Sequence, residues 1–387
     1  MQRVPNLNPI YFDHVSSTPV HPEVLKSQSE LSLLHYANSE ALHDAGHRIA
    51  SMVEKSRESI AALLKIKPES ITFTSGATES NNAIIKGIAF ANITKGKHLI
   101  TTSVEHSSVL ESFKQLETSF GFEVTYLSVD KEGRISLDEL KNALRTDTTL
   151  VSIMHVNNEI GTIMPVKACS KIIKENSTAY FHVDEVQAIG KIPFDFSFVD
   201  AASCSAHKIN GVKGSGLMIV KEKVKILSLI TGGQQENGHR GGTANAINNI
   251  LFAKTLRLAL SEYDSHLKQV QLLNAYLRDE LKAIKEIIVN SPEHDVSPYI
   301  INFSVLTLSS EVLLNWFNSQ GIYVSAQSTC NSKTKHVSIT LQAMGLSEAA
   351  LNGSLRVGIA ASNTQEEAER FIKVLKEGLV SYGSPLR

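Results

Sequence analysis

The sequence is poor in cysteine and has no excess of charge of either sign. It contains three cysteines, Cys169, Cys204 and Cys330, and their spacing matches no metal-ligand pattern. A sparse, odd-numbered set of this kind argues against a disulfide framework, favours a reducing cytoplasm and predicts no metal site. The net charge is −1 and no long basic run occurs, which argues against nucleic-acid binding driven by gross charge.

Long hydrophobic runs are also missing. No segment approaches the apolar length that crosses a bilayer, and residues 1–9 lack the apolar core of a secretory signal, so we expect no membrane contact. The composition is that of an ordinary globular protein, 42% hydrophobic and 20% charged. A length of 387 residues suggests one large and one small domain.

Short apolar runs alternate with amphipathic stretches between about residues 70 and 220. This alternation predicts an α/β fold with a doubly wound, mostly parallel sheet of seven strands. We interpret the following runs as strands: 71–73, 98–101, 123–127, 150–154, 180–183, 201–204 and 217–220. Helical stretches between them include 107–118, 137–144 and 166–175. Ligands bind such sheets beyond the carboxyl ends of the strands.

The pattern changes after about residue 245. Two long helical segments, 244–263 and 267–287, precede strands at 299–305, 323–325 and 354–359 and helices at 310–319 and 365–380. This order is typical of a smaller α+β domain, which a strand at 10–13 can join. We therefore expect a large domain over residues 14–258 and a small domain formed by residues 1–13 and 259–387.

An acidic residue and a lysine follow successive predicted strands. Asp184 closes one strand, Gln187 lies one helical turn later, and Lys208 comes just after the next strand. Pyridoxal phosphate chemistry needs such a pair, because a lysine forms a Schiff base with the cofactor aldehyde and a carboxylate keeps the pyridine nitrogen protonated. Asp184 alone also fits a helix cap, but the combination is more specific. Ser205 and His207 flank the lysine and can reach a phosphate.

Three further strand ends carry polar residues. The turn at 74–79 begins a helix whose free N–H groups, with Thr78, suit a phosphate, although a plain capped helix has the same pattern. His106 can stack on a cofactor ring and transfer protons, or be structural. Asn157 can donate to the phenolic oxygen of the ring, or form a turn. The glycine-rich loop at 232–243 suits either a phosphate or a domain connection.

Two of the cysteines have opposite surroundings. Cys204 lies in an apolar run and fits a small core residue, whereas Cys330 lies in a polar stretch with Lys333, Lys335 and His336 nearby. Those cationic groups favour the thiolate, the nucleophilic form, although an incidental surface cysteine fits as well. Arg356, in a strand of the small domain, suits either a substrate carboxylate or a structural ion pair.

Taken together, these segments resemble the cysteine desulfurases, in their long-loop group, within the class V aminotransferases and the fold-type I pyridoxal phosphate enzymes. The resemblance covers almost the whole chain. The matching segments are 74–82, 104–106, 154–161, 182–187, 205–214, 240–243, Cys330 and Arg356. It implies removal of sulfur from L-cysteine, with pyridoxal 5′-phosphate as cofactor.

The resemblance also implies a role for each matching residue. Lys208 is the Schiff-base lysine and His106 a proton-transfer residue that stacks on the ring. Cys330 is the catalytic cysteine that receives sulfur as a persulfide. Arg356 binds the substrate carboxylate. The cofactor contacts are Ala77, Thr78, His106, Asn157, Asp184, Gln187, Ser205, His207, Lys208 and Thr243. Asn157 also contacts the substrate, and Thr243 serves the partner subunit, which implies a homodimer with shared active sites.

The segment after Asp13 departs from the family pattern. His14, Val15 and Ser16 replace the usual Asn-Ala-Ala, and Ala206 replaces a glycine before His207. These changes touch the substrate entrance more than the cofactor. A selenocysteine lyase, another pyridoxal phosphate-dependent C–S lyase, and a non-catalytic sulfur-relay or scaffold protein are the alternatives. The sequence does not name the sulfur acceptor: iron–sulfur cluster assembly, transfer-RNA thiolation and cofactor biosynthesis are all open.

Overall fold

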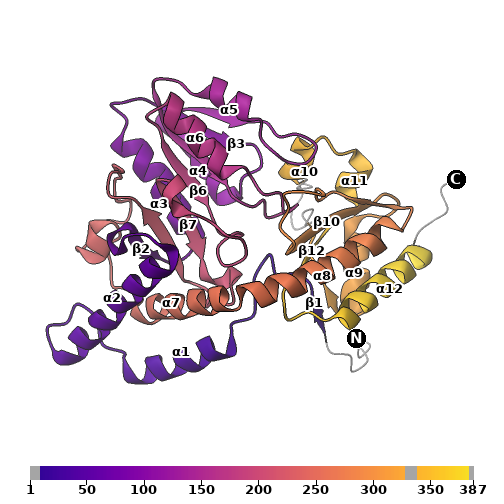
Figure 1. The fold of residues 1–387 in the computed structure, drawn as a ribbon, viewed down its shortest axis with the longest axis horizontal. Helices are drawn as coiled ribbons and strands as arrows, with labels where there is room; N and C mark the ends of the chain where they lie inside the picture. The colour runs from indigo at the N-terminus through magenta and orange to yellow at the C-terminus, as the bar shows by residue number, and fades with distance from the viewer. Residues whose placement is uncertain (1–8, 327–337, 383–387) are drawn as a thin grey trace.

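The larger part of the molecule is built on a seven-stranded sheet (Figure 1). The computed structural model describes residues 9–326 and 338–382. The strands, in their order across the sheet, are β2 (Ile71–Thr74), β8 (Gly216–Val220), β7 (Ala201–Ser205), β6 (Tyr180–Asp184), β5 (Thr148–Met154), β3 (His98–Thr102) and β4 (Glu123–Leu127). β8 runs antiparallel to both of its neighbours, β2 and β7, and the other strand pairs are parallel. The predicted α/β fold with a mostly parallel sheet of seven strands is confirmed.

Helices cover both faces of this sheet, so its strands are apolar on both sides. Leu99 and Leu150 pack on one face with α3 (Ala77–Ala91) and α4 (Ser107–Phe120). Ile100 and Val151, their neighbours in the chain, join the core on the other face. That second core includes side chains of α2 (Asp44–Leu64), α6 (Val166–Asn176) and α7 (Ala246–Ser261), with α5 (Leu137–Ala143) beside α6. Burial on both faces is the reason that the strands form continuous apolar runs.

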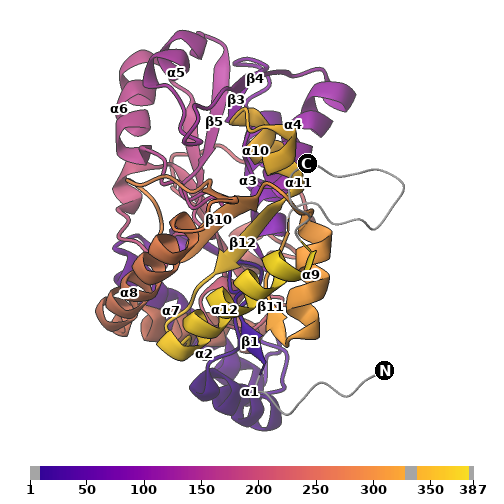
Figure 2. The same ribbon diagram turned by 90° about the vertical axis from the view of Figure 1, so that its right-hand side faces the viewer.

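A smaller body holds the rest of the chain, and α7 leads through α8 (Tyr263–Lys282) from one body to the other (Figure 1). Its antiparallel sheet has the order β12 (Ser354–Gly358), β10 (Ile300–Val305), β9 (Ile287–Val289). The helices α9 (Ser310–Ser319) and α12 (Gln365–Tyr382) pack together at Phe317 and Phe371, whose rings stack with centroids 5.0 Å apart (Figure 2). Two short helices, α10 (Ile339–Ala343) and α11 (Glu348–Asn352), complete this body.

The N-terminal strand lies against the smaller body. β1 (Ile10–Tyr11) pairs in parallel with β11 (Ile322–Tyr323), and Asp13 forms a bridge with Gly358. The chain then returns to the larger body through α1 (Pro22–Leu34) (Figure 1). Residues just after β1 therefore lie between the two bodies. The expected domain boundaries at residues 13 and 258 stay a prediction.

Two features differ from the expectations drawn from the sequence. The helices α1 and α2 were not predicted. α1 buries only Val24 and so has little apolar pattern, whereas α2 buries Ile49, Val53 and Ile60 at a helical spacing that the sequence did carry. The second long helix was predicted to reach residue 287, but α8 ends at Lys282. The β-branched run from Ile287 to Val289 forms β9 instead, since such residues favour strands. In the described part of the chain, no helix has both the length and the apolar character needed to span a membrane.

Candidate active site

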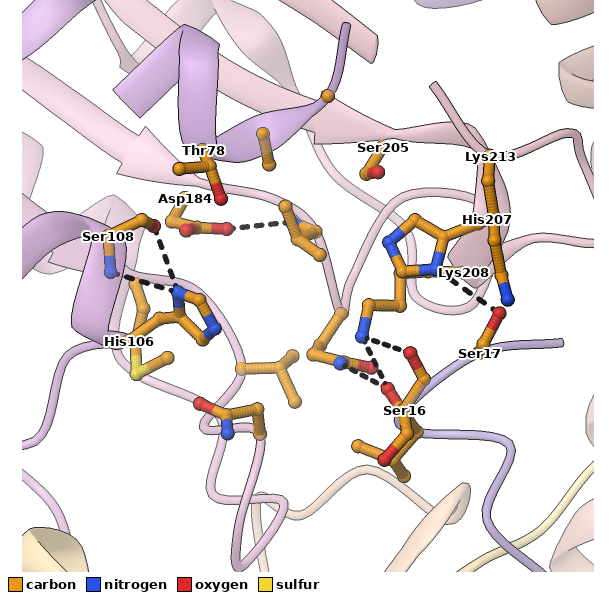
Figure 3. A pocket seen from close by; sticks show the side chains of 18 of the residues that line it. Ser16, Ser17, Thr78, His106, Ser108, Asp184, Ser205, His207, Lys208 and Lys213 are labelled. Carbon is orange, nitrogen blue, oxygen red and sulfur yellow. Dashed lines mark hydrogen bonds between the residues drawn. The ribbon is translucent and has the colours of Figure 1, made fainter. Parts of the chain in front are cut away.

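A cavity of about 790 Å³ opens at the carboxyl ends of the parallel strands. Its walls come from the segments that follow β2, β3, β5, β6 and β7, together with Ser16 from the N-terminal segment and Arg356 from the smaller body. In Figure 3, His106 and Asp184 lie on one side of the open space, and Lys208 and His207 lie on the other. The side chains predicted from the strand ends therefore meet in one place.

Lys208 ends the short 3₁₀ turn that follows β7. Its Nζ donates hydrogen bonds to two backbone carbonyl oxygens, those of Val15 at 2.7 Å and Ser16 at 2.8 Å (Figure 3). Burial, helped by the nearby positive charge of Arg356, lowers the pKa of Lys208 to about 8. An amine with that pKa is unprotonated in an appreciable fraction of molecules at neutral pH, which is the form that attacks an aldehyde.

Asp184 is the last residue of β6, the strand beside β7, and its side chain lines the cavity. One carboxylate oxygen accepts a hydrogen bond from the Asn81 side chain at 2.8 Å, and the other accepts one from the backbone N–H of Val186 at 3.0 Å. Both donors hold the carboxylate in a fixed orientation. A fixed carboxylate at the wall of the cavity is what a protonated ring nitrogen requires.

A second carboxyl group, Glu105, lies buried behind Asp184. It accepts hydrogen bonds from the backbone N–H of Met154 and the hydroxyl of Thr102, both at 2.8 Å, and so joins the ends of β3 and β5. Burial, with a smaller contribution from Asp184, raises the pKa of Glu105 to about 8. Glu105 is therefore mostly neutral at pH 7, and Asp184 is spared a second negative charge at close range.

His106 is the N-cap of α4 and faces the cavity. Its Nδ1 accepts the backbone N–H of Ser108 at 3.1 Å, so in the neutral imidazole the proton is on Nε2 (Figure 3). The surrounding protein desolvates the ring and lowers its pKa. A neutral ring with a defined tautomer suits both stacking and proton transfer.

The start of α3 offers donors for a phosphate. Gly76 is its N-cap, with φ of +152°, and no side chain caps the helix among the described residues. The first N–H groups of this 15-residue helix are thus free to bind an anion. Ala77, Thr78, Ser205, His207 and Lys213 also line the cavity. This donor set fits the phosphate of a pyridoxal phosphate cofactor.

Gln187 also lines the cavity, and its amide is held by two partners. Its Nε2 donates to the carbonyl oxygen of Val15 at 3.1 Å, and its Oε1 accepts from Lys191 Nζ at 3.3 Å. The carbonyl oxygen of Val15 can only accept, so it fixes which end of the amide is the donor. The donor end of Gln187 is therefore on the side of Val15 and Lys208.

Asn157 lies outside the cavity lining, while its neighbour Asn158 is part of it. The side chain of Asn157 is fully buried: its Oδ1 accepts the N–H groups of Glu159 and Ile160, and its Nδ2 donates to the carbonyl oxygen of Val104 at 3.0 Å. In this conformation Asn157 fastens the loop after β5 to the loop after β3. Its contact with cofactor and substrate stays a prediction.

Arg356 projects from β12 into the cavity wall and is 5% exposed. Nη1 donates to the carbonyl oxygen of Asn158 at 2.8 Å, and Nη2 donates to the Ser16 hydroxyl at 2.8 Å and to Asp13 Oδ1 at 3.2 Å. Nε has no hydrogen-bond partner among the described residues. A buried N–H of this kind is costly unless something binds it, and a substrate carboxylate has the right chemistry.

Thr243, like Asn157, is not brought to this cavity. Thr243 is exposed and is not part of the lining. It belongs to the loop held by the Arg57–Glu236 and Arg240–Glu79 ion pairs, with closest distances of 2.9 Å and 3.0 Å. Cys330 lies outside the described residues. The other two cysteines are buried, and burial raises the pKa of Cys169 to about 12 and that of Cys204 well above its usual range, so neither supplies a thiolate.

Comparison with known proteins agrees with this geometry. The aminotransferase class-V family profile matches residues 10–371. A cysteine desulfurase IscS from Dictyoglomus turgidum is 41% identical over 370 residues, which are 95% of this chain and 93% of the relative. The chain belongs to the cysteine desulfurase family. The fold-type I framework and the family resemblance expected from the sequence are thereby confirmed.

Solved structures support the same family. One described as a NifS-like protein is 36% identical, with a TM-score of 0.91, and the match covers 96% of this chain and 100% of the other. Another, described as SspA in complex with cysteine, is 31% identical with a TM-score of 0.80, covering 92% of this chain and 100% of the other. Enzymes of this family use pyridoxal 5′-phosphate, and the residues around Lys208 fit that cofactor.

Several residues that act at the site were not found from the sequence. Asn81 and Ser108 hold Asp184 and His106, and Val15 and Ser16 hold Lys208. Asn81 lies one turn after Ala77, the first residue of α3, so its helical position was a usable signal. The contacts of Val15 and Ser16 are made by backbone carbonyls almost two hundred residues away, for which a single sequence has no signal.

Proposed function

We propose that this protein removes sulfur from L-cysteine, with pyridoxal 5′-phosphate as cofactor, and yields L-alanine and a persulfide on Cys330. The observation that carries the proposal is the placement of Lys208 and Asp184 at the ends of adjacent strands, in one cavity with His106 and Arg356. The names of the relatives, and the cysteine found with SspA, support L-cysteine as the substrate.

Different residues around the cavity would bind different parts of the cofactor. Lys208 would hold it covalently, Asp184 would pair with the ring nitrogen, and Gln187 and Asn157 would donate to the ring oxygen. Ala77, Thr78, Ser205 and His207 would bind the phosphate at the start of α3. When bound, the cofactor supplies a protonated ring that takes up the negative charge left at the substrate Cα.

The remaining groups act on the substrate. Arg356 binds the carboxylate, and Lys208, with its pKa of about 8, removes the Cα proton as a general base. His106 transfers a proton through its Nε2. The Cys330 thiolate attacks the substrate sulfur, so that a sulfur–sulfur bond forms as the carbon–sulfur bond breaks. The Cα and Cβ fragment accepts protons and leaves as L-alanine.

The protein is further proposed to work as a cytoplasmic homodimer that passes sulfur to an acceptor protein, for iron–sulfur cluster assembly or the thiolation of transfer RNA or a cofactor. Thr243 is exposed and away from its own cavity, which suits a contact with the site of a second subunit. Co-expressed Lys208→Ala and Thr243→Ala chains test this arrangement. Mixed dimers should regain one intact site and part of the activity, whereas no gain over the separate variants contradicts shared sites.

Substitution of the proposed sulfur-accepting residue tests the reaction itself. A Cys330→Ser variant should keep the yellow absorbance of the bound cofactor but form almost no L-alanine from L-cysteine. Cys169→Ala is the matched control, because that thiol is buried and has a raised pKa, and its alanine formation should stay near that of the unchanged protein. Full activity of Cys330→Ser would refute the role of Cys330. Faster turnover of selenocysteine than of cysteine would favour a selenocysteine lyase. Absence of the yellow absorbance band in the unchanged protein would favour a non-catalytic sulfur-relay protein.

A further inference from the structure

Ser16 connects Lys208 and Arg356, two of the positively charged side chains that line the cavity. Its backbone carbonyl accepts a hydrogen bond from Lys208 Nζ at 2.8 Å, and its hydroxyl accepts one from Arg356 Nη2 at 2.8 Å. Ser16 itself is exposed at the cavity wall (Figure 3). The residue belongs to the segment 13–19, which crosses between the two bodies of the molecule.

The hydroxyl of Ser16 also has a partner for its own hydrogen. It donates to Asp13 Oδ1 at 2.8 Å, and the same oxygen lies 3.2 Å from Arg356 Nη2. A serine hydroxyl has one hydrogen to donate and can accept as well, so Ser16 stands between the carboxylate and the guanidinium with both functions used. Asp13 is thus shared between Ser16 and Arg356.

This sharing matters because Asp13 competes with any substrate carboxylate for Arg356. A hydrogen bond with an ionised donor or acceptor is roughly twice as strong as one between neutral groups, and both bonds to Asp13 Oδ1 are of this kind. When the Ser16 hydroxyl donates to Asp13, it weakens the pull of Asp13 on the guanidinium. Without that hydroxyl, Arg356 would be the one side-chain partner of Asp13 Oδ1 among the described residues, and Asp13 would hold it more firmly.

We infer that Ser16 is a positioning residue for the substrate carboxylate. It acts by weakening the interaction of Asp13 with Arg356, so that the guanidinium can bind the substrate. The inference rests on the proposed function, in which Arg356 binds that carboxylate. Alanine cannot perform this role, because its side chain has no hydrogen-bonding group. Ser16 therefore sets the affinity for an α-amino acid and leaves the affinity for an amine without a carboxylate unchanged.

The test compares two ligands that differ by one carboxylate. L-Alanine and ethylamine are titrated into the cofactor-loaded protein, and the change in cofactor absorbance gives a dissociation constant for each. Ser16→Ala should weaken L-alanine about tenfold, on the scale of one hydrogen bond to a charged group, and leave ethylamine within about twofold. Ser16→Thr, which keeps the hydroxyl, should restore the affinity. Ser119→Ala, at an exposed helical serine, is the matched control and should change neither constant.

The role of Asp13 provides a second arm. In an Asp13→Asn background the competing charge is gone, so adding Ser16→Ala should cost less than about threefold for L-alanine, a clear departure from additivity. Ser16 is exposed, so its truncation leaves no internal void that would prevent folding. An unchanged L-alanine constant, an equal loss for both ligands, or additive effects of the two substitutions would each overturn the inference. If the unchanged protein binds both ligands equally, or neither, the carboxylate role of Arg356 and the proposed function fail instead.

Discussion

The lowered pKa of Lys208 has a consequence that can be measured when the cofactor binds. Only the unprotonated amine attacks the aldehyde of pyridoxal phosphate. With a pKa of about 8, about 10% of Lys208 is unprotonated at pH 7. An ordinary lysine, with a pKa of 10.5, is unprotonated in only about 0.03% of molecules at that pH. Burial therefore makes Lys208 about 300-fold more available than a free amine at neutral pH.

The assay mixes cofactor-free protein with pyridoxal phosphate and follows the yellow absorbance by stopped flow from about pH 6.5 to about pH 10. A short lysine peptide in the same buffers is the control, because it reports the titration of the cofactor itself. The ratio of the two rate constants should be largest near neutral pH and should fall above about pH 8, where Lys208 is already unprotonated.

A variant separates the causes of the shift. Burial is the main cause and Arg356 the second, so Arg356→Gln should move the midpoint of the protein's rate profile to a somewhat higher pH without restoring that of the free amine. A rate constant for the unchanged protein that rises in parallel with that of the peptide up to about pH 10 would refute the reasoning.

Two further predictions concern stability, measured by urea unfolding of the cofactor-free protein. Burial lowers the pKa of Lys191 from 10.5 to about 7, so between these pH values the unfolded chain binds one more proton than the folded protein. The resulting loss of folding stability grows as the pH falls and is complete below about pH 7. Lys191→Met should stabilise the fold by about 1–3 kcal/mol at pH 6, a figure that allows for the lost hydrogen bond to Gln187. The gain in stability should decrease progressively toward pH 10. A gain that does not depend on pH would contradict this prediction. Glu236→Gln breaks the ion pair with Arg57, in which both side chains are 6% exposed, and should lower the free energy of unfolding by about 2–4 kcal/mol. Glu222→Gln, in an exposed pair with Lys67, should lower it by less than about 1 kcal/mol. Equal losses for the two variants would show that burial does not make the Arg57–Glu236 pair more important for stability.

Most strand positions could be predicted because their residues are apolar on both faces of a covered sheet, and those strands differ from the prediction by one or two residues at their ends. The edge strand from Glu123 to Leu127, in which only Leu127 is buried, was predicted with its observed bounds. The position of Lys208 after β7 and of Asp184 at the end of β6 follows from those strands. Since parallel strands end at one edge, their convergence could be predicted as well.

The contacts that complete the site could not be predicted in the same way. Pairing of Lys208 with the Val15 and Ser16 carbonyls depends on how the segment after β1 crosses between the two bodies. The antiparallel direction of β8 and the position of β2 at the edge of the sheet depend on pairing between distant segments. Such contacts are decided by the packing of the whole chain and leave no local pattern.

Asn157 shows that the position of a residue at a strand end does not decide where its side chain lies. Its position after β5 was correctly read as a strand end, yet its amide is used within the loop while Asn158 reaches the cavity. Sequence identifies the edge at which a polar residue lies. Which of two neighbouring amides lines the cavity depends on backbone hydrogen bonds that form only in the folded loop.

The most direct test of the proposed reaction is mass spectrometry of the Cys330 peptide after the cofactor-loaded protein has reacted with L-cysteine under conditions that preserve persulfides. The peptide should be heavier by one sulfur atom, in an amount that matches the L-alanine formed in the first turnover. The peptides containing Cys169 and Cys204, which are buried, should be unchanged. Formation of L-alanine without added sulfur on Cys330, or no L-alanine from a protein that carries its cofactor, would contradict the proposed function.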